Sequence, residues 1–322
     1  MYNVGIIGLG GMGQKMLADM AVHSSFTVTT IWDPDPDSAA ASAVIAKHPI
    51  MKISANADEL IADPGVDLVY VASPPQSHRG YFLSAIEAKT AVYCEKPFGV
   101  NVTESAELLV EIERAKLPHV LNFNHGNARG STHIEKQMKS GAMGDVVGIE
   151  VLVHLNQWPR AFQETATWLA KREQGGFTRE ILSHWLYLTR RLLGEGDIVH
   201  AHVKYPADGT SAETHLMADL DFSGVPVFIR AATGGAGPAG TEYTVRGSKM
   251  SYRLHSGGRI SASDGGPWAE QFTEISDIGD KERQRTLDGV AARLRGEDIN
   301  MPTARDGFEV QKLVEHLLAA GD

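Results

Sequence analysis

Hydrophobic and polar positions follow two different patterns on either side of residue 122. Before it, short apolar runs that indicate buried strands alternate with segments whose apolar residues recur at helical spacing. The predicted strands are Val4–Gly8, Thr27–Trp32, Met51–Ile53, Leu68–Ala72, Thr90–Cys94 and His119–Phe123. The predicted helices are Gln14–Val22, Ser38–Lys47, Ala57–Ala62, Arg79–Ala88 and Val102–Ala115. Strands that alternate with helices predict a doubly wound parallel sheet.

The later part of the chain combines a few helices with many extended segments. The predicted helices are Thr132–Ser140, a segment from the pair Gly175-Gly176 to Leu193, Arg283–Leu294 and Ala304–Leu318. The predicted strands are Val146–Leu155, Ile198–Tyr205, Glu213–Phe222, Pro226–Thr233, Thr241–Arg246, Lys249–Leu254 and Arg259–Ala262. Turn residues at short spacing favour antiparallel pairing. We therefore expect an α/β protein with domains at 1–122 and 123–322, the second an α+β domain with a large, open, mostly antiparallel sheet.

The composition of the chain limits the classes of partner that it can bind and indicates the cellular compartment. The 322 residues carry a net charge of −10 and no long basic run, which argues against a nucleic-acid partner. No apolar run is long enough for a membrane span and no signal peptide is expected, so we expect no membrane partner. The single cysteine, Cys94, makes no internal disulfide and fits a reducing, cytoplasmic location.

The first predicted strand runs into Gly-x-Gly-x-x-Gly at Gly8, Gly10 and Gly13. Gly8 permits a tight turn, Gly10 permits close approach of a pyrophosphate, and Gly13 permits close packing of the following helix. The second strand then ends at Asp33, where a carboxylate can bind ribose hydroxyls. This context predicts a dinucleotide-binding (Rossmann) domain.

Two further segments lie at the ends of predicted parallel strands, the edge where such sheets bind ligands. One contains Ser73-Pro74 and His78, and the residue pattern favours a capping or packing role for His78. The other is Glu95-Lys96-Pro97, in which a proline restricts the backbone next to the lysine. A surface ion pair is the alternative interpretation of Lys96.

A third segment follows Gly175-Gly176. Glu180 and His184 are four residues apart and are expected on one face of a helix. A carboxylate can orient an imidazole and raise its basicity, as in general acid–base sites, although a purely structural pair is also possible. No third ligand lies at a customary spacing, so no metal site is expected.

These pieces together resemble the glucose–fructose oxidoreductase / inositol dehydrogenase / MocA-like family over essentially the whole chain. The matching residues are Gly8–Gly13, Asp33-Pro34, Ser73-Pro74 with His78, Glu95-Lys96-Pro97, Ser140–Gly144 and Gly175–His184. The resemblance implies a nicotinamide-dependent oxidoreductase acting on a sugar, polyol or related hydroxyl carbon. It also implies that Lys96 and His184 contact the reacting hydroxyl.

The chain departs from the family pattern beside the expected site. Glu180 replaces an aspartate, Leu182 replaces a glycine, Tyr187 stands where an aspartate is frequent, and His125-Gly126 replaces an arginine. A more apolar pocket is expected, which suits a larger or modified sugar-like substrate, a ketone or an imine.

The resulting site prediction places the substrate over the nicotinamide, in a cleft between the domains. The candidate catalytic residues are Lys96, His184 and Glu180. The candidate substrate-binding residues are Lys96, His125, Arg179 and His184. The candidate cofactor-binding residues are Gly8, Gly10, Gly11, Met12, Gly13, Asp33, Ser73, Pro74, His78, Glu95 and Lys96. His184 is expected to act as acid–base, oriented by Glu180, while Lys96 polarises the oxygen.

Three functions stay open at this point. The first is net hydride transfer; the second is a lyase or glycosidase-like reaction in which tightly bound NAD is reduced and reoxidised. The third is a non-catalytic nucleotide-sensing regulator, which the presence of Lys96 and His184 disfavours. NAD is expected over NADP because Asp33, Asp35 and Asp37 precede any basic residue until Lys47.

A homodimer or homotetramer is expected, because the second sheet has apolar residues on both alternations of its strands. The residues behind this expectation are Val199, Val203, Leu216, Ala218, Leu220, Val227 and Ile229.

Overall fold

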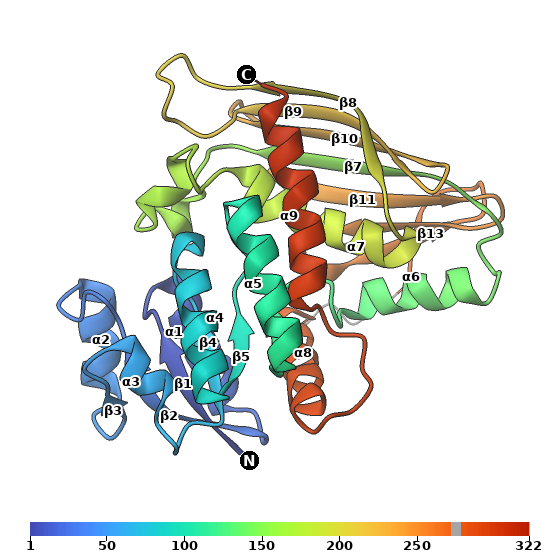
Figure 1. Cartoon of the computed structure of the whole chain (residues 1–322). Helices are drawn as coiled ribbons and strands as arrows, with labels where there is room; N and C mark the ends of the chain where they lie inside the picture. Colours follow the sequence, from blue (N-terminus) through green and yellow to red (C-terminus); the bar gives the residue numbers. More distant parts are fainter. Residues whose placement is uncertain (272–277, 322) are drawn as a thin grey trace. The chain divides into compact units, whose positions relative to one another are not determined.

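The computed structural model describes residues 1–271 and 278–321, which form two compact units (Figure 1). Unit 1 consists of Met1–Phe123 and Arg283–Gln311, and unit 2 of Asn124–Glu282 and the chain from Lys312 onward. The structure therefore differs from the predicted division at 122, because a late segment belongs with the first unit. None of the described helices is long and apolar enough to cross a lipid bilayer.

Unit 1 contains a parallel sheet with strand order β3-β2-β1-β4-β5-β6. Its strands are β1 (Tyr2–Ile7), β2 (Phe26–Trp32), β3 (Lys52–Ile53), β4 (Leu68–Val71), β5 (Ala91–Cys94) and β6 (His119–Leu121). Its helices are α1 (Gly11–Ala21), α2 (Ala39–Lys47), α3 (Ala57–Ile61), α4 (His78–Ala88), α5 (Val102–Ala115) and the 3-10 turn η1 (Pro75–Ser77). The predicted doubly wound parallel sheet is confirmed, with bounds that shift by a few residues at most strand and helix ends.

Both faces of this sheet are covered. On one face, Val4 and Ile6 of β1 join a buried cluster with Met16 of α1 and Leu287 of α8 (Ile278–Leu294). On the other face, a Cβ at Gly5 would lie 2.4 Å from a Leu60 methyl of α3. The alternation of side chains along each strand thus fills two apolar layers.

The late segment is tied to unit 1 by charge as well as by packing. The His23 imidazole lies 3.2 Å from the Asp288 carboxylate, and Arg283 Nε donates to Asp19 at 2.8 Å. The sequence pattern predicts the helix 283–294 but gives no sign of these partners, which lie far away along the chain.

Unit 2 contains a sheet with strand order β14-β13-β12-β11-β7-β10-β9-β8. Its strands are β7 (Val146–Leu155), β8 (Asp197–Lys204), β9 (His215–Phe222), β10 (Val225–Thr233), β11 (Gly240–Gly247), β12 (Ser251–His255), β13 (Ile260–Ser263) and β14 (Ala269–Glu270). The β7–β10 pair is parallel, whereas the other pairs in the described part of this sheet are antiparallel. The predicted large, mostly antiparallel sheet is confirmed.

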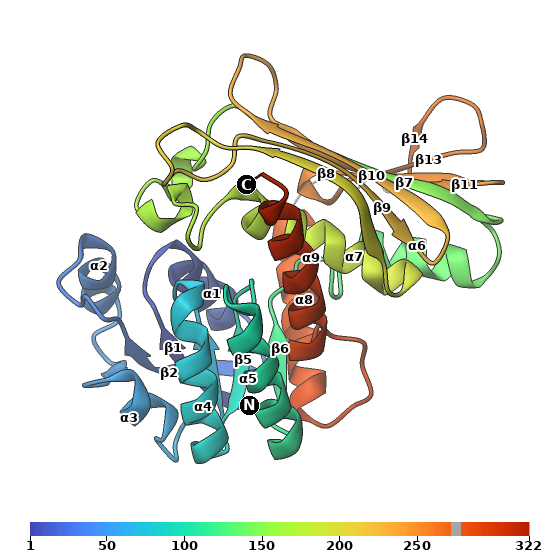
Figure 2. The same ribbon diagram turned by 45° about the horizontal axis from the view of Figure 1, so that its top comes forward.

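Helices α6 (Arg129–Lys139) and α7 (Ser183–Leu193) lie along one face of this sheet (Figure 2). A π-helical turn, η4 (Thr178–Leu182), leads directly into α7. The remaining helical segments are the 3-10 turns η2 (Ala161–Gln163), η3 (Thr167–Ala170) and η5 (Ser256–Gly258), and α9 (Ala304–Ala319), which begins in unit 1 and ends in unit 2.

The apolar residues of the two strand alternations have different surroundings. Val203, Leu216, Ala218, Leu220, Val227 and Ile229 are buried, so they belong to the core rather than to an open surface. Val199 is exposed, together with residues that the sequence pattern did not single out: Leu152, Met217 and Phe228. The open face is therefore less apolar than the pattern predicts.

Candidate functional site

The glycine-rich turn after β1 is dictated by steric contact within unit 1. Gly8 has φ +92°, and a Cβ there would lie 2.7 Å from the Ala72 carbonyl oxygen. A Cβ at Gly13 would lie 1.8 Å from the Gly8 carbonyl oxygen. Real Cβ atoms do not approach oxygen so closely, so any side chain at Gly8 or Gly13 would force the strand and the helix apart.

Gly10 and Gly11 have a different environment. A Cβ at either position would meet no atom of the protein within 4 Å. Gly10 also caps α1 without a side-chain hydrogen bond, and the first turn of α1 contains no acid. This helix start thus has open space at its glycines and no acid in its first turn, so the residues present fit the phosphates of a dinucleotide. The exposed Met12 side chain lies in the same turn.

Asp33 follows β2 and has a positioning role besides any contact with ribose. Its Oδ2 accepts the Leu9 N–H at 2.6 Å, and its Oδ1 accepts the Asp35 N–H at 2.9 Å. A cavity of about 210 Å³ lies against this carboxylate. It is lined by Leu9, Ile31, Trp32, Asp33, Pro34, Pro36, Ile45, Ile53, Ser54 and Ala55, with no cation among them.

A buried carboxylate lies at the end of the neighbouring strand β5. Glu95 accepts hydrogen bonds from the Tyr70 hydroxyl and, at 2.6 Å, from Asn122 Nδ2. The Tyr93 hydroxyl in turn donates to Asn122 Oδ1 at 2.6 Å. Burial, followed by the charge of Glu95, raises the pKa of Tyr70 well above its ordinary value. Three adjacent strand ends are thus connected through one carboxylate.

Lys96 and His78 are both removed from solvent. Lys96 is 9% exposed at the carboxyl end of β5. The His78 ring is fully buried, with Nδ1 and Nε2 each 3.0 Å from a carbonyl oxygen, that of Pro97 and that of Ser73 respectively. Burial lowers the pKa of His78 to about 4. These two contacts agree with the packing interpretation of His78, and a contact of His78 with the cofactor stays a prediction.

Ser73 and Pro74 form the first of these turns. The Ser77 hydroxyl donates to Ser73 Oγ at 2.7 Å, and Pro74 is exposed. His78 thus holds the Ser73 turn beside the Glu95-Lys96-Pro97 turn.

In unit 2, the pair Gly175-Gly176 is required by a buried acid and by two carbonyl groups. A Cβ at Gly175 would lie 2.4 Å from the Trp168 carbonyl oxygen, and one at Gly176 would lie 2.3 Å from a Glu213 carboxylate oxygen. Glu213 Oε1 accepts the Thr178 N–H at 2.7 Å, and burial raises the pKa of this carboxyl. Glu213 was not predicted because it lies far from the glycine pair in sequence.

Arg179, predicted to bind substrate, is buried among partners of its own unit. Its Nε and Nη2 donate to the two Glu315 oxygens at 2.7 and 2.6 Å. Its Nη1 donates to the carbonyl groups of Arg172 and Gly175 at 2.9 and 2.8 Å. These four hydrogen bonds favour a structural role, and a contact of Arg179 with substrate stays a prediction.

Glu180 lies in the π-helical turn, not in a regular α-helix. Its Oε1 accepts hydrogen bonds from Arg160 Nη2 at 3.3 Å and from Gln163 Nε2 at 3.0 Å. The expected relation between residues four apart holds for a regular α-helix, whereas a π-turn changes the angular relation of successive side chains. The orientation of His184 by Glu180 therefore stays a prediction.

His184 lies at the start of α7. Its Nδ1 accepts the backbone N–H of Asn124 at 3.2 Å. The His125 ring lies 6.4 Å away in an edge-on arrangement and packs on Trp185 with 4.2 Å between centroids. Burial, and after it the charge of Arg191, lowers the pKa of His125 to about 3, so this ring is neutral. Two predicted substrate-binding histidines are thus neighbours within unit 2.

Two family models cover nearly the whole chain. The model described as oxidoreductase family, NAD-binding Rossmann fold, matches residues 2–123. The model described as oxidoreductase family, C-terminal alpha/beta domain, matches residues 135–320.

The chain belongs to this oxidoreductase family. It is thus a member of the glucose–fructose oxidoreductase / inositol dehydrogenase / MocA group that the sequence resembles. Its first domain is an NAD-binding Rossmann fold.

Curated relatives of this family member include dehydrogenases and a hydratase. An inositol 2-dehydrogenase from Burkholderia multivorans is 31% identical over 66% of the chain and 60% of its own length. A 2,7-anhydro-N-acetylneuraminate hydratase from Escherichia coli is 26% identical over 61% of the chain and 50% of its own length. The matched part of the chain thus spans about half to three fifths of these relatives.

Solved structures share the fold across both units. An oxidoreductase from Agrobacterium radiobacter, crystallised with NAD⁺, L-tartaric acid and magnesium, has a TM-score of 0.84 at 19% identity, covering 99% of this chain and 96% of its own. A biliverdin reductase from Synechocystis, in complex with biliverdin and NADP⁺, has a TM-score of 0.79 at 16% identity, covering 99% of both chains. At this identity the similarity concerns the fold alone.

Gly10 and Gly13 provide a matched pair of variants. We predict that Gly10→Ala folds with an unchanged melting temperature but binds NAD about tenfold or more weakly, a loss of about 1.4 kcal/mol. Gly13→Ala should lose about 3 kcal/mol of stability, because its Cβ overlaps the Gly8 carbonyl. Thermal unfolding and cofactor titration measure both effects. Normal NAD binding by Gly10→Ala would contradict the phosphate assignment.

The carboxylate at Asp33 predicts a preference for NAD over NADP by about 10²-fold in Kd, because a 2′-phosphate would meet a negative charge. Asp33→Asn keeps an oxygen that can accept the Leu9 N–H but removes the negative charge. It should therefore reduce the ratio of the Kd for NADP to the Kd for NAD. Asp37→Asn, which changes an exposed acid farther along the chain, is the control. Fluorescence titration with both cofactors decides the point, and equal or tighter NADP binding by the wild type would refute it.

His78 predicts a loss of stability in mild acid. Above pH 6.5 both the folded and unfolded states hold a neutral ring; below it, the unfolded state binds a proton that the folded state accepts only near pH 4. We expect this group to remove about 3 kcal/mol of unfolding free energy between these limits. In urea unfolding, the stability difference between wild type and His78→Gln should shrink by that amount from pH 7.5 to 4. The difference in unfolding free energy between wild type and the exposed control His316→Gln should not shrink in this way. If the two differences change equally with pH, His78 does not titrate as predicted.

Proposed function

We propose that the chain is an NAD-dependent oxidoreductase that transfers a hydride between nicotinamide and a hydroxyl or carbonyl carbon of a sugar, polyol or sugar-like substrate. The observation that carries the proposal is the buried Lys96 at the end of β5. This strand pairs with β4, which in turn pairs with β1, the strand that leads into the glycine-rich turn. In parallel sheets of this kind, ligands bind at the carboxyl ends of the strands. A buried amine at this edge would meet a reacting oxygen that binds there.

The names of the relatives support the substrate class. Inositol 2-dehydrogenase and the levoglucosan dehydrogenase of Pseudarthrobacter phenanthrenivorans are both named for the oxidation of a carbon that carries a hydroxyl group. The latter is 25% identical over 62% of this chain. We infer a carbohydrate or polyol substrate for this chain by the same family membership.

Two side chains are proposed to contact the reacting oxygen, Lys96 and His184. Oxidation requires a group that accepts the hydroxyl proton and a donor that stabilises the oxygen as its charge develops. From the sequence, the first task is assigned to His184, oriented by Glu180, and the second to Lys96. Bound NAD would accept the hydride, and Gly10, Gly11 and Asp33 would hold its phosphate and ribose groups.

One relative favours a second candidate function. The Escherichia coli relative is named a hydratase, a reaction without net redox. The same residues would serve such an enzyme if tightly bound NAD were reduced and reoxidised within one turnover. Purified protein that carries NAD, and that converts substrate without any accumulation of NADH, would favour this function over net oxidation.

We further propose a homodimer or homotetramer, located in the cytoplasm. Met217, Phe228 and Leu152 are 58, 49 and 46% exposed on adjacent strands of the unit 2 sheet, a surface that association would cover. The free, buried thiol of Cys94 suits a reducing compartment.

The function is tested by following NADH absorbance with panels of sugars, polyols, ketones and imines. With a substrate in hand, Lys96→Ala and His184→Ala should lower kcat by about 10²–10⁴-fold and leave NAD binding nearly unchanged. The exposed His316→Ala is the control and should retain wild-type kcat. Normal turnover by both site variants would show that the chemistry takes place elsewhere.

A further inference from the structure

The hydrogen bond to His184 restricts the protonation state of its ring. A backbone N–H is always a donor, so the Nδ1 atom that accepts it from Asn124 at 3.2 Å carries no proton. The neutral ring then carries its proton on Nε2. A second proton on Nδ1 would face the Asn124 N–H, so the imidazolium form would lose this hydrogen bond.

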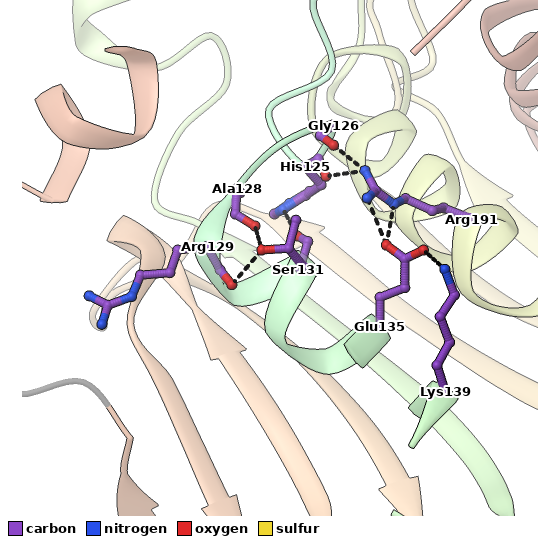
Figure 3. Close-up of polar contacts among 9 residues, drawn as sticks. His125, Gly126, Ala128, Arg129, Ser131, Glu135, Lys139 and Arg191 are labelled. Atoms are coloured by element: carbon purple, nitrogen blue, oxygen red, sulfur yellow. Dashed lines mark hydrogen bonds and ion pairs between the residues drawn. The ribbon is translucent and has the colours of Figure 1, made fainter. Parts of the chain in front are cut away.

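The segment that supplies this N–H is clamped by a buried arginine (Figure 3). Arg191 Nη1 donates to the Gly126 carbonyl and, at 3.5 Å, to the His125 carbonyl. Its Nε and Nη2 donate to Glu135 at 3.0 and 2.7 Å, and Lys139 also donates to Glu135, at 2.6 Å. The Arg191 side chain is 8% exposed and that of Glu135 15%.

The clamp joins three elements of unit 2. Arg191 projects from α7, the helix that carries His184 in its first turn, while Glu135 projects from α6. The His125 ring adds a contact to Ser131 of α6 at 3.1 Å. Because the carbonyls of His125 and Gly126 are held from α7, the preceding Asn124 N–H is held toward the same helix. A planar, permanently charged guanidinium suits such a fork-shaped contact better than an amine.

We propose that Arg191 is a positioning residue for His184. By fixing the Asn124 N–H, Arg191 holds the His184 ring in the Nε2–H tautomer. The Nε2–H group of His184 then donates a hydrogen bond to the substrate oxygen. This inference rests on the proposed function for its last step and reverses the assignment of proton transfer made from sequence. In alcohol oxidation the Lys96 side chain, in its unprotonated amine form, would accept the hydroxyl proton as the O–H bond breaks. Bound NAD⁺ would supply the acceptor for the hydride that leaves the same carbon.

The tautomer is measured without turnover, in full-length protein with ¹⁵N-labelled histidine. Long-range ¹H–¹⁵N correlations distinguish protonated from unprotonated ring nitrogens, and the signals that disappear in His184→Gln identify the residue. We expect wild-type His184 to show an unprotonated Nδ1 and a protonated Nε2. An Nδ1–H tautomer, or an imidazolium at pH 7, would overturn the proposal.

Arg191→Met should shift His184 toward a mixture of tautomers, and Arg191→Lys should have an intermediate effect. The matched control is Arg190→Met, one residue earlier on α7, with a side chain that is 9% exposed and paired with Glu195. It should leave the His184 signals unchanged. Retention of the wild-type tautomer by folded Arg191→Met would refute a positioning role.

Asn124→Pro removes the donor itself and keeps the test decisive if Arg191→Met does not fold. It should release Nδ1 of His184 while Arg191 and Glu135 remain in place, and an unchanged tautomer would overturn the proposal. With an identified substrate, Arg191→Met should lower kcat by up to about 10²-fold with an unchanged Kd for NAD. Failure to find any oxidisable substrate would count against the proposed function, whereas the NMR result would still decide the role of Arg191.

Discussion

The site in unit 1 depends on one buried carboxylate. Removing a carboxylate from water costs several kcal/mol unless hydrogen bonds replace those of the solvent. Glu95, directly after β5, is 6% exposed; its partner Tyr70 lies in β4 and its partner Asn122 directly follows β6. The charge is therefore tolerated only while the ends of β4, β5 and β6 keep their register. Lys96 follows directly, so its position depends on the same set of contacts.

Local pattern predicts the elements because each is decided by burial of its own side chains. Alternating strands and helices, the antiparallel sheet and the helix Val102–Ala115 are all found in the structure. The placement of 283–311 in unit 1 is decided instead by partners such as Asp19 and His23, remote in sequence. The hydrophobic periodicity of a segment does not predict which distant acidic residue pairs with an arginine in that segment. The short strand β14 lacks the length to give any pattern.

The candidate site shows the same division between local and distant causes. Gly8, Gly13 and Asp33 could be predicted because a turn, a helix start and a strand end impose fixed spacings. For His78 and Arg179, predicted to contact the cofactor and the substrate, the sequence does not reveal which groups of the protein surround them. The structure buries both: His78 lies against two backbone carbonyls, and Arg179 pairs with Glu315. The π-helical turn that contains Glu180 has no sequence signature that a spacing rule detects.

The division of unit 1 into two stretches of chain has a consequence for synthesis on the ribosome. When the first 123 residues emerge, the parallel sheet has all its strands but lacks Leu287, Val290, Ala291 and Met301 of its apolar layer. One face of the nascent sheet therefore stays uncovered while the intervening 159 residues of unit 2, Asn124–Glu282, are made. Exposed apolar surface of this kind promotes aggregation of folding intermediates. That face stays uncovered until Leu287, Val290, Ala291 and Met301 have been made.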